Sequence, residues 1–172
     1  GFEESYGYLA GTHSRDKDAI VAAMLICQMA DFYKSKNMSL IDALEIIYQK
    51  YGRQKEILSS IELKGLEGLE RIKQIMSELR DNLPKEICSI KIKSVSDYKT
   101  SKKNNSDGSV SELKFPKSDV LLFELEDNSW ICIRPSGTEP KIKIYVGAQV
   151  KDNQSDKLEK LLDAFKKIIG EK

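Results

Sequence analysis

A short run of residues with anion-binding chemistry lies between two segments of alternating apolar residues. It contains one arginine, two hydroxyl side chains, a glycine and two prolines, in the order Arg134, Pro135, Ser136, Gly137, Thr138, Glu139, Pro140. Arg134 can present a planar fork of donors to a phosphate, and Gly137 allows backbone N–H groups to turn toward the same point. A plain β-hairpin connection with a surface arginine is the alternative interpretation. Four phosphate-binding groups within five positions favour the anion site.

A second polar cluster opens the chain, in the order Gly1, Phe2, Glu3, Glu4, Ser5, Tyr6, Gly7. Two carboxylates can indicate glycosidase chemistry, but adjacent residues of a strand point to opposite faces and cannot flank one bond. Taken alone, Glu3 and Glu4 are typical of a polar surface turn, because such charges are commonly solvated.

The two motifs together resemble those of a known enzyme family. Residues 134–141, followed by a strand over residues 142–146, resemble the phosphate-binding loop in the C-terminal domain of α-D-phosphohexomutases, the phosphoglucomutase and phosphomannomutase family. The opening segment is similar to the family's sugar-recognition loop, and residues 15–18 resemble a lysine-bearing segment that follows that loop in phosphoglucomutases. The motifs lie in the order and at the approximate separation that the family requires.

The resemblance implies a mechanism in which an enzyme phosphoserine and a bisphosphate intermediate interconvert hexose 1-phosphate and 6-phosphate. It implies Mg²⁺ as cofactor, glucose 1,6-bisphosphate as intermediate or activator, and a cytoplasmic enzyme. Binding the non-reacting phosphate positions the substrate, and such positioning can lower the activation barrier for phosphoryl transfer by roughly 7 to 11 kcal/mol. The residues that would bind this phosphate are Arg134, Ser136, Gly137, Thr138 and Lys143, and those that would bind the sugar are Glu3, Ser5 and Lys17. At Lys17, a solvated helix start with Asp16 or Asp18 as the cap is an equal alternative.

Two other motifs of the family are missing from the sequence. It contains no Thr-Ala-Ser-His-Asn-Pro nucleophile loop and no Asp-Gly-Asp-Gly-Asp metal loop. We therefore expect no catalytic residue, no metal ligand and no mutase activity in the chain alone, with upstream domains of the same enzyme supplying them. Because the chain opens with a glycine inside a motif, it is interpreted as a fragment. A noncatalytic phosphosugar- or anion-binding module is the alternative function.

Composition and charge limit the possible partners. The chain has 172 residues, of which 40% are hydrophobic and 32% charged, and its formal net charge is +1. No global field would therefore attract nucleic acid or an anionic membrane, and the apolar stretch over residues 19–27 is too short to span a bilayer. Three cysteines in apolar segments, without metal-type spacing, predict buried reduced thiols: Cys27, Cys88 and Cys132.

The pattern of residues 53–172 predicts an α+β domain, an antiparallel sheet with helices on one face. The expected strands cover residues 57–63, 87–95, 120–125, 130–133 and 142–150, and the expected helices cover residues 69–83 and 155–168. Asp127 and Asn128 would form a hairpin turn, and Lys143 would lie on the side away from the core. The polar segment of residues 97–118 predicts a long mobile surface loop.

Residues 1–52 predict two helices and a loop. Residues 19–30 are apolar nearly all round, which predicts a helix buried between neighbours. Its last turns become amphipathic through Phe32 and Tyr33, and Lys36 and Asn37 would end it. Ser39 and Asp42 resemble a capping box for a second helix that ends at Gly52. Two helices cannot complete an α/β domain, so this part is interpreted as the helical tail of one. The resemblance assigns residues 1–52 to the end of the family's third domain and residues 53–172 to its fourth.

Overall fold

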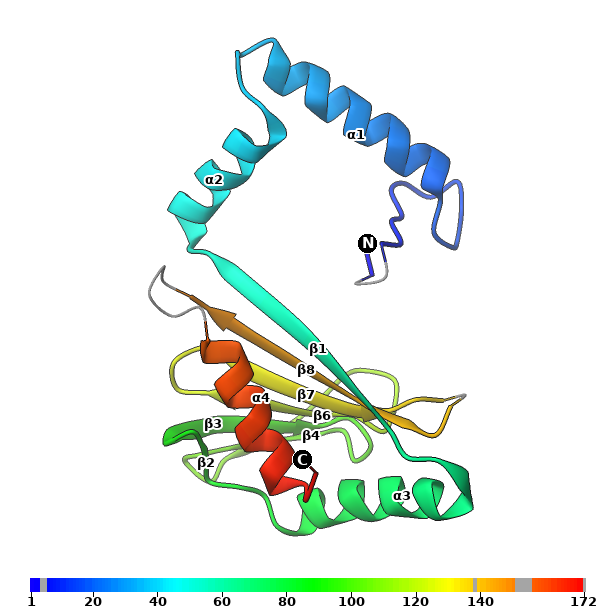
Figure 1. The fold of residues 1–172 in the computed structure, drawn as a ribbon, viewed down its shortest axis with the longest axis vertical. Helices are drawn as coiled ribbons and strands as arrows, with labels where there is room; N and C mark the ends of the chain where they lie inside the picture. The colour runs from blue at the N-terminus through cyan, green and yellow to red at the C-terminus, as the bar shows by residue number, and fades with distance from the viewer. Residues whose placement is uncertain (4–5, 138, 151–155, 172) are drawn as a thin grey trace. The chain divides into compact units, whose positions relative to one another are not determined.

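The computed structural model describes residues 1–3, 6–137, 139–150 and 156–171. The chain divides into two compact units, Gly1–Gly52 and Arg53–Lys172 (Figure 1). Each unit is described by itself below.

An antiparallel sheet forms the frame of the second unit. Within the described residues its eight strands are β1 (Gln54–Glu62), β2 (Glu86–Ile87), β3 (Ile90–Asp97), β4 (Lys102–Asn105), β5 (Val110–Glu112), β6 (Leu121–Leu125), β7 (Trp130–Pro135) and β8 (Lys141–Gln149). They follow the order β1-β8-β7-β6-β3-β4-β5, and β2 pairs with β3. The helices of this unit are α3 (Gly65–Asp81) and α4 (Lys157–Ile168). The predicted α+β class is confirmed.

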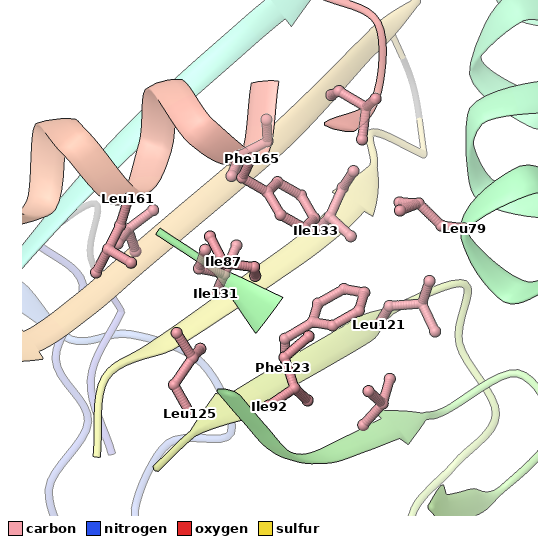
Figure 2. Close-up of a cluster of buried hydrophobic side chains, with 14 of the residues drawn as sticks. Leu79, Ile87, Ile92, Leu121, Phe123, Leu125, Ile131, Ile133, Leu161 and Phe165 are labelled. Carbon is pink, nitrogen blue, oxygen red and sulfur yellow. The ribbon is translucent and has the colours of Figure 1, made fainter. Parts of the chain in front are cut away.

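One apolar core lies between the sheet and its two helices. Alternate residues of β6, β7 and β8 are buried together with stripes of α3 and α4. Figure 2 shows side chains of β6 and β7 beside Leu79 of α3 and Phe165 of α4. The rings of Phe123 and Phe165 meet edge to face, with centroids 5.3 Å apart. Gly68 allows α3 to approach the end of β1, since a Cβ there would lie 1.9 Å from the carbonyl oxygen of Leu63. The other face of the sheet carries both charged and apolar side chains, among them Glu124, Arg134 and Lys143 beside Leu122 and Trp130.

Two strand predictions in this unit are wrong. Residues 97–118 are not a long loop, because β4 and β5 form a hairpin there whose turn has Gly108 at φ +85°. β4 is wholly polar, and β5, the strand at the edge of the sheet, has Val110 as its one apolar residue, so neither shows the alternating apolar pattern that predicts a strand. The single strand expected over residues 87–95 is the pair β2 and β3, because Cys88 and Ser89 at φ 50° and 61° form a tight two-residue turn.

The first unit contains α1 (Ala19–Lys34) and α2 (Leu40–Tyr51). The predicted capping box is confirmed: the Ser39 hydroxyl accepts from the Asp42 N–H, and the Asp42 carboxylate accepts from the Ser39 N–H. The prediction that the first helix is buried is wrong for this chain, since α1 has no buried residue and Ile20 is 83% exposed. One other helix and one loop cannot enclose a helix that is apolar on all sides.

The cysteine prediction is also wrong in part. All three cysteines are free, but Cys27 and Cys88 are exposed, because they lie on the open surface of α1 and in the β2–β3 turn. Cys132 of β7 is half-buried, and burial raises the pKa of its thiol to about 11. Cys132 therefore carries no charge near neutral pH.

Candidate functional site

The arginine-bearing loop joins two central strands of the second unit. β7 and β8 are antiparallel neighbours, with Arg134 opposite Lys143 and Pro135 opposite Ile142. Ile133 and Ile144, the next pair along the ladder, are fully buried against the helices. Because side chains alternate along a strand, Arg134 and Lys143 both project from the face of the sheet that points away from the helices.

The electrostatics of this pair favour an anion. Side chains directly opposite in an antiparallel ladder have Cβ atoms about 4.5–5.5 Å apart, and like charges at such positions repel. Over the described part of the chain, neither Arg134 nor Lys143 forms an ion pair with a carboxylate. The guanidinium of Arg134 lies over the ring of Tyr145, 5.9 Å from the centroid. Arg134 and Lys143 thus project from the same face of the sheet, and neither is paired with an acid among the residues that the structure describes.

Backbone hydrogen bonds hold the base of the loop. The N–H of Ser136 donates to the carbonyl of Lys141 over 2.8 Å, and the N–H of Leu63 at the end of β1 donates to the carbonyl of Pro140 over 2.9 Å. Ser136 is half-buried, whereas Gly137 is exposed and a Cβ added to it would meet nothing within 4 Å. The backbone at Gly137 is therefore accessible to a ligand. Thr138, the remaining predicted phosphate ligand, lies outside the described residues.

Two of the predicted sugar-binding residues meet in the first unit. The Nζ atom of Lys17 lies 3.5 Å from a carboxylate oxygen of Glu3, and both side chains line a cavity of about 240 Å³. The chain folds back at this point, since the Glu3 N–H donates to the Gly7 carbonyl over 2.8 Å. Ser5, the third predicted sugar ligand, lies outside the described residues. Sequence reasoning missed Arg15, which lines the same cavity and had no signal beyond its place beside Lys17.

Lys17 is held on three sides. Its ammonium lies 3.1 Å from Asp16, and its aliphatic carbons lie across Gly7, where an added Cβ would be 2.6 Å from Cγ of Lys17. The hydrogen bond and charge of Asp16, followed by the charge of Glu3, raise the pKa of Lys17 above its ordinary value. Asp18 caps α1 by accepting from the N–H groups of Ile20 and Val21. Lys17 therefore precedes a helix capped by Asp18, as the alternative interpretation predicts, and its ammonium also faces Glu3.

Replacing Gly7 with alanine should lower the pKa of Lys17 toward its ordinary value. The new methyl group would force the lysine side chain into another rotamer, away from Asp16 and Glu3. An NMR titration of the Lys17 side chain measures this pKa directly. Asp16→Asn should lower the same pKa, whereas Asp31→Asn in α1 should leave it unchanged. A pKa of Lys17 that stays raised in the Gly7→Ala variant would contradict the close approach of these two residues.

The described residues do not fit a metal ion or a membrane span. Among them, no group of three or more histidine, cysteine, aspartate or glutamate residues could hold a metal. None of the described helices has the length and apolar character needed to cross a bilayer.

Comparison with known proteins matches both units to one family. Residues 42–167 match the model described as phosphoglucomutase/phosphomannomutase, C-terminal domain, and residues 1–51 match the model described as phosphoglucomutase/phosphomannomutase, alpha/beta/alpha domain III. Two phosphoglucomutases of Staphylococcus aureus are similar in sequence. The one from strain bovine RF122 / ET3-1 is 47% identical over 146 residues, which are 84% of this chain and 26% of that protein. The one from strain MRSA252 is 45% identical over 152 residues, which are 88% of this chain and 27% of that protein.

The chain thus spans about a quarter of the length of these curated relatives. A solved structure agrees on the fold. The open form of pp63/parafusin, a phosphoglucomutase from Paramecium, matches with a TM-score of 0.60 at 19% identity, covering 97% of this chain and 29% of that one.

Proposed function

The chain belongs to the phosphoglucomutase/phosphomannomutase family and is a C-terminal part of such an enzyme, and we propose that its β7–β8 loop binds the non-reacting phosphate of a hexose phosphate. The observation that carries this proposal is the direct opposition of Arg134 and Lys143 across β7 and β8, with no acid neutralising them among the described residues. A doubly charged phosphate between them would replace repulsion with two charge-assisted contacts. Ser136, Gly137 and Thr138 would add donors from the loop itself.

The first unit would bind the hydroxyl groups of the sugar. The carboxylate of Glu3 can accept two O–H bonds from a vicinal diol, and the ammonium of Lys17 beside it can donate to another sugar oxygen. Ser5 would add a hydroxyl. A cavity of about 240 Å³ at these residues supports the proposal, because it leaves room for part of a hexose ring.

The intact protein would interconvert hexose 1-phosphate and hexose 6-phosphate in the cytoplasm. Upstream domains would supply the phosphorylated serine and the ligands for Mg²⁺, and the role of this chain would be positioning. By holding the spectator phosphate and the hydroxyls, it would place the other end of the substrate for phosphoryl transfer, whichever way the sugar faces. In a glucose 1,6-bisphosphate intermediate, each of the two phosphates would in turn be the non-reacting one that this loop binds. The chain alone would have no turnover.

A titration of the isolated 172-residue chain with inorganic phosphate and with glucose 6-phosphate tests this assignment. We expect both ligands to shift the backbone amide signals of Ser136 and Gly137, and only the sugar phosphate to shift those near Glu3 and Lys17. Sodium chloride at matched ionic strength is the control. Unmoved signals at Ser136 and Gly137 with both ligands would reject the phosphate site. Mutase turnover when the chain is joined to upstream domains would distinguish the enzyme from a noncatalytic binding module.

A further inference from the structure

A tyrosine lies beside the two opposed cations and has no role in the proposed binding of phosphate. Tyr145 is two residues beyond Lys143 on β8, which makes it the diagonal neighbour of Arg134 across the β7–β8 ladder. Diagonal pairs are within reach of long and aromatic side chains. The guanidinium carbon of Arg134 lies over the ring of Tyr145, 5.9 Å from its centroid, which is within the range of a cation–π contact.

The surroundings of Tyr145 fix its ring on the sheet. Its neighbours in register are Cys132 on β7 and Leu58 on β1, so Tyr145 lies on the middle one of three adjacent strands. Tyr145 is half-buried, whereas Arg134 is exposed. The ring of Tyr145 is therefore the less mobile partner of the contact. The contact reduces the rotamer freedom of the longer, exposed side chain of Arg134.

An aromatic partner suits an arginine that must remain available to an anion. A guanidinium carries its N–H donors in its own plane, so a ring against its flat face leaves those donors free. A carboxylate partner would instead occupy the donors and cancel the charge that attracts phosphate. The ring thus restrains Arg134 without competing with its ligand, which lowers the entropy lost when the anion binds.

We propose that Tyr145 is a positioning residue that holds the guanidinium of Arg134 in a phosphate-ready orientation. The proposal rests on the phosphate site proposed above and assigns it a residue outside the loop. A contact of this kind at an exposed site should change the Kd for phosphate by about 2- to 5-fold.

The test compares the Kd for inorganic phosphate of the full 172-residue chain with that of three variants. Tyr145→Leu should weaken binding about 2- to 5-fold, and Tyr145→Phe, which keeps the ring, should bind like the unchanged chain. Tyr98→Leu removes another tyrosine ring, one that packs against Phe115, and should have no effect. Weakened binding in Tyr145→Phe would assign the effect to the phenol hydroxyl and overturn the proposal.

A double variant separates positioning from a general effect on folding. In an Arg134→Gln background, Tyr145→Leu should cause no further loss, because the side chain that it positions is gone. An equal loss in both backgrounds, or none in either, would overturn the proposal.

A second measurement keeps this inference distinct from the phosphate site itself. The ¹⁵Nε order parameter of Arg134 should fall in Tyr145→Leu and stay unchanged in Tyr145→Phe, with no ligand added. If phosphate does not shift the loop signals of the unchanged chain, the proposed function fails. If the order parameter is insensitive to the ring, the positioning role fails, whatever the affinity for phosphate.

Discussion

Replacing Arg134 with glutamine should weaken the binding of inorganic phosphate to the chain by about 10- to 100-fold, because hydrogen bonds to a charged group contribute about 1.5–3 kcal/mol. Glutamine keeps a planar donor group but removes the charge and one arm of the guanidinium fork. The loss should appear as a higher Kd in calorimetry or in the amide shifts of Ser136. In the complete enzyme, kcat/KM should fall with it, since the grip on the spectator phosphate is lost.

A second cation of the same hairpin provides the matched control. Lys141 is already paired with Glu139, 3.2 Å away, so its charge is in part neutralised. Lys141→Gln should therefore change the Kd for phosphate far less than Arg134→Gln, and Arg134→Lys should fall between the two because it keeps the charge without the fork. Equal losses in the Arg134 and Lys141 variants would mean that the hairpin attracts anions only through its overall charge.

Replacing Arg80 with methionine should lower the free energy of unfolding by about 2–4 kcal/mol, since removing one partner leaves a buried charge unpaired. The Nε atom of Arg80 on α3 lies 3.2 Å from Asp97, and a terminal nitrogen of the same side chain lies 2.5 Å from Asp119. The side chains of Arg80 and Asp97 are only 17% and 10% exposed, so solvent cannot replace this contact. Urea denaturation with circular dichroism measures the change.

The same network has a predictable dependence on pH. Burial alone would raise the pKa of Asp97, but hydrogen bonds from Arg80, Thr100 and the Lys99 N–H outweigh it, and the net pKa is lowered. Its contribution to stability is therefore fully present above the unfolded value of about 3.9 and is lost as the pH falls through the lower folded value. In Arg80→Met this acid-dependent loss should shrink. Lys160→Met, which breaks an exposed ion pair with Asp156, should leave the midpoint of urea denaturation unchanged.

Local sequence signals located most elements that support the site. Ser39 and Gly52 mark the ends of α2. The alternation of apolar and polar residues on both sides of Asp127 and Asn128 predicts the β6–β7 hairpin. Both predictions succeed because caps and turns depend on residues that are close in sequence. The sequence pattern does not predict the hairpin of β4 and β5, because β4 is wholly polar and the short edge strand β5 has only Val110 as an apolar residue. The burial of α1 was mispredicted because an apolar pattern shows what a helix can bury and not whether this chain provides the neighbours.

The candidate sites were predictable in their residue types and not in their contacts. The pairing of Arg134 with Lys143 depends on the register of β7 and β8, and the contact of Lys17 with Glu3 depends on a backbone reversal that no short motif specifies. Tyr145 could have been found from sequence, since it shares a strand face with Lys143 two positions away. The sequence pattern favours Asp16 as a helix cap and gives no signal of its ion pair with Lys17.

The two charge arrangements of the second unit should respond to ionic strength in opposite directions. Added salt screens the attraction within the Arg80 network only weakly, because that network is largely sheltered from counterions. At the tip of the β7–β8 hairpin, the same salt relieves the repulsion between Arg134 and Lys143 and supplies small anions to the space between them. At low ionic strength, this end of the β7–β8 hairpin should therefore open more easily than the part of the sheet held by the Arg80 network. A bound phosphate ester would replace the counterions that dilute buffer does not supply.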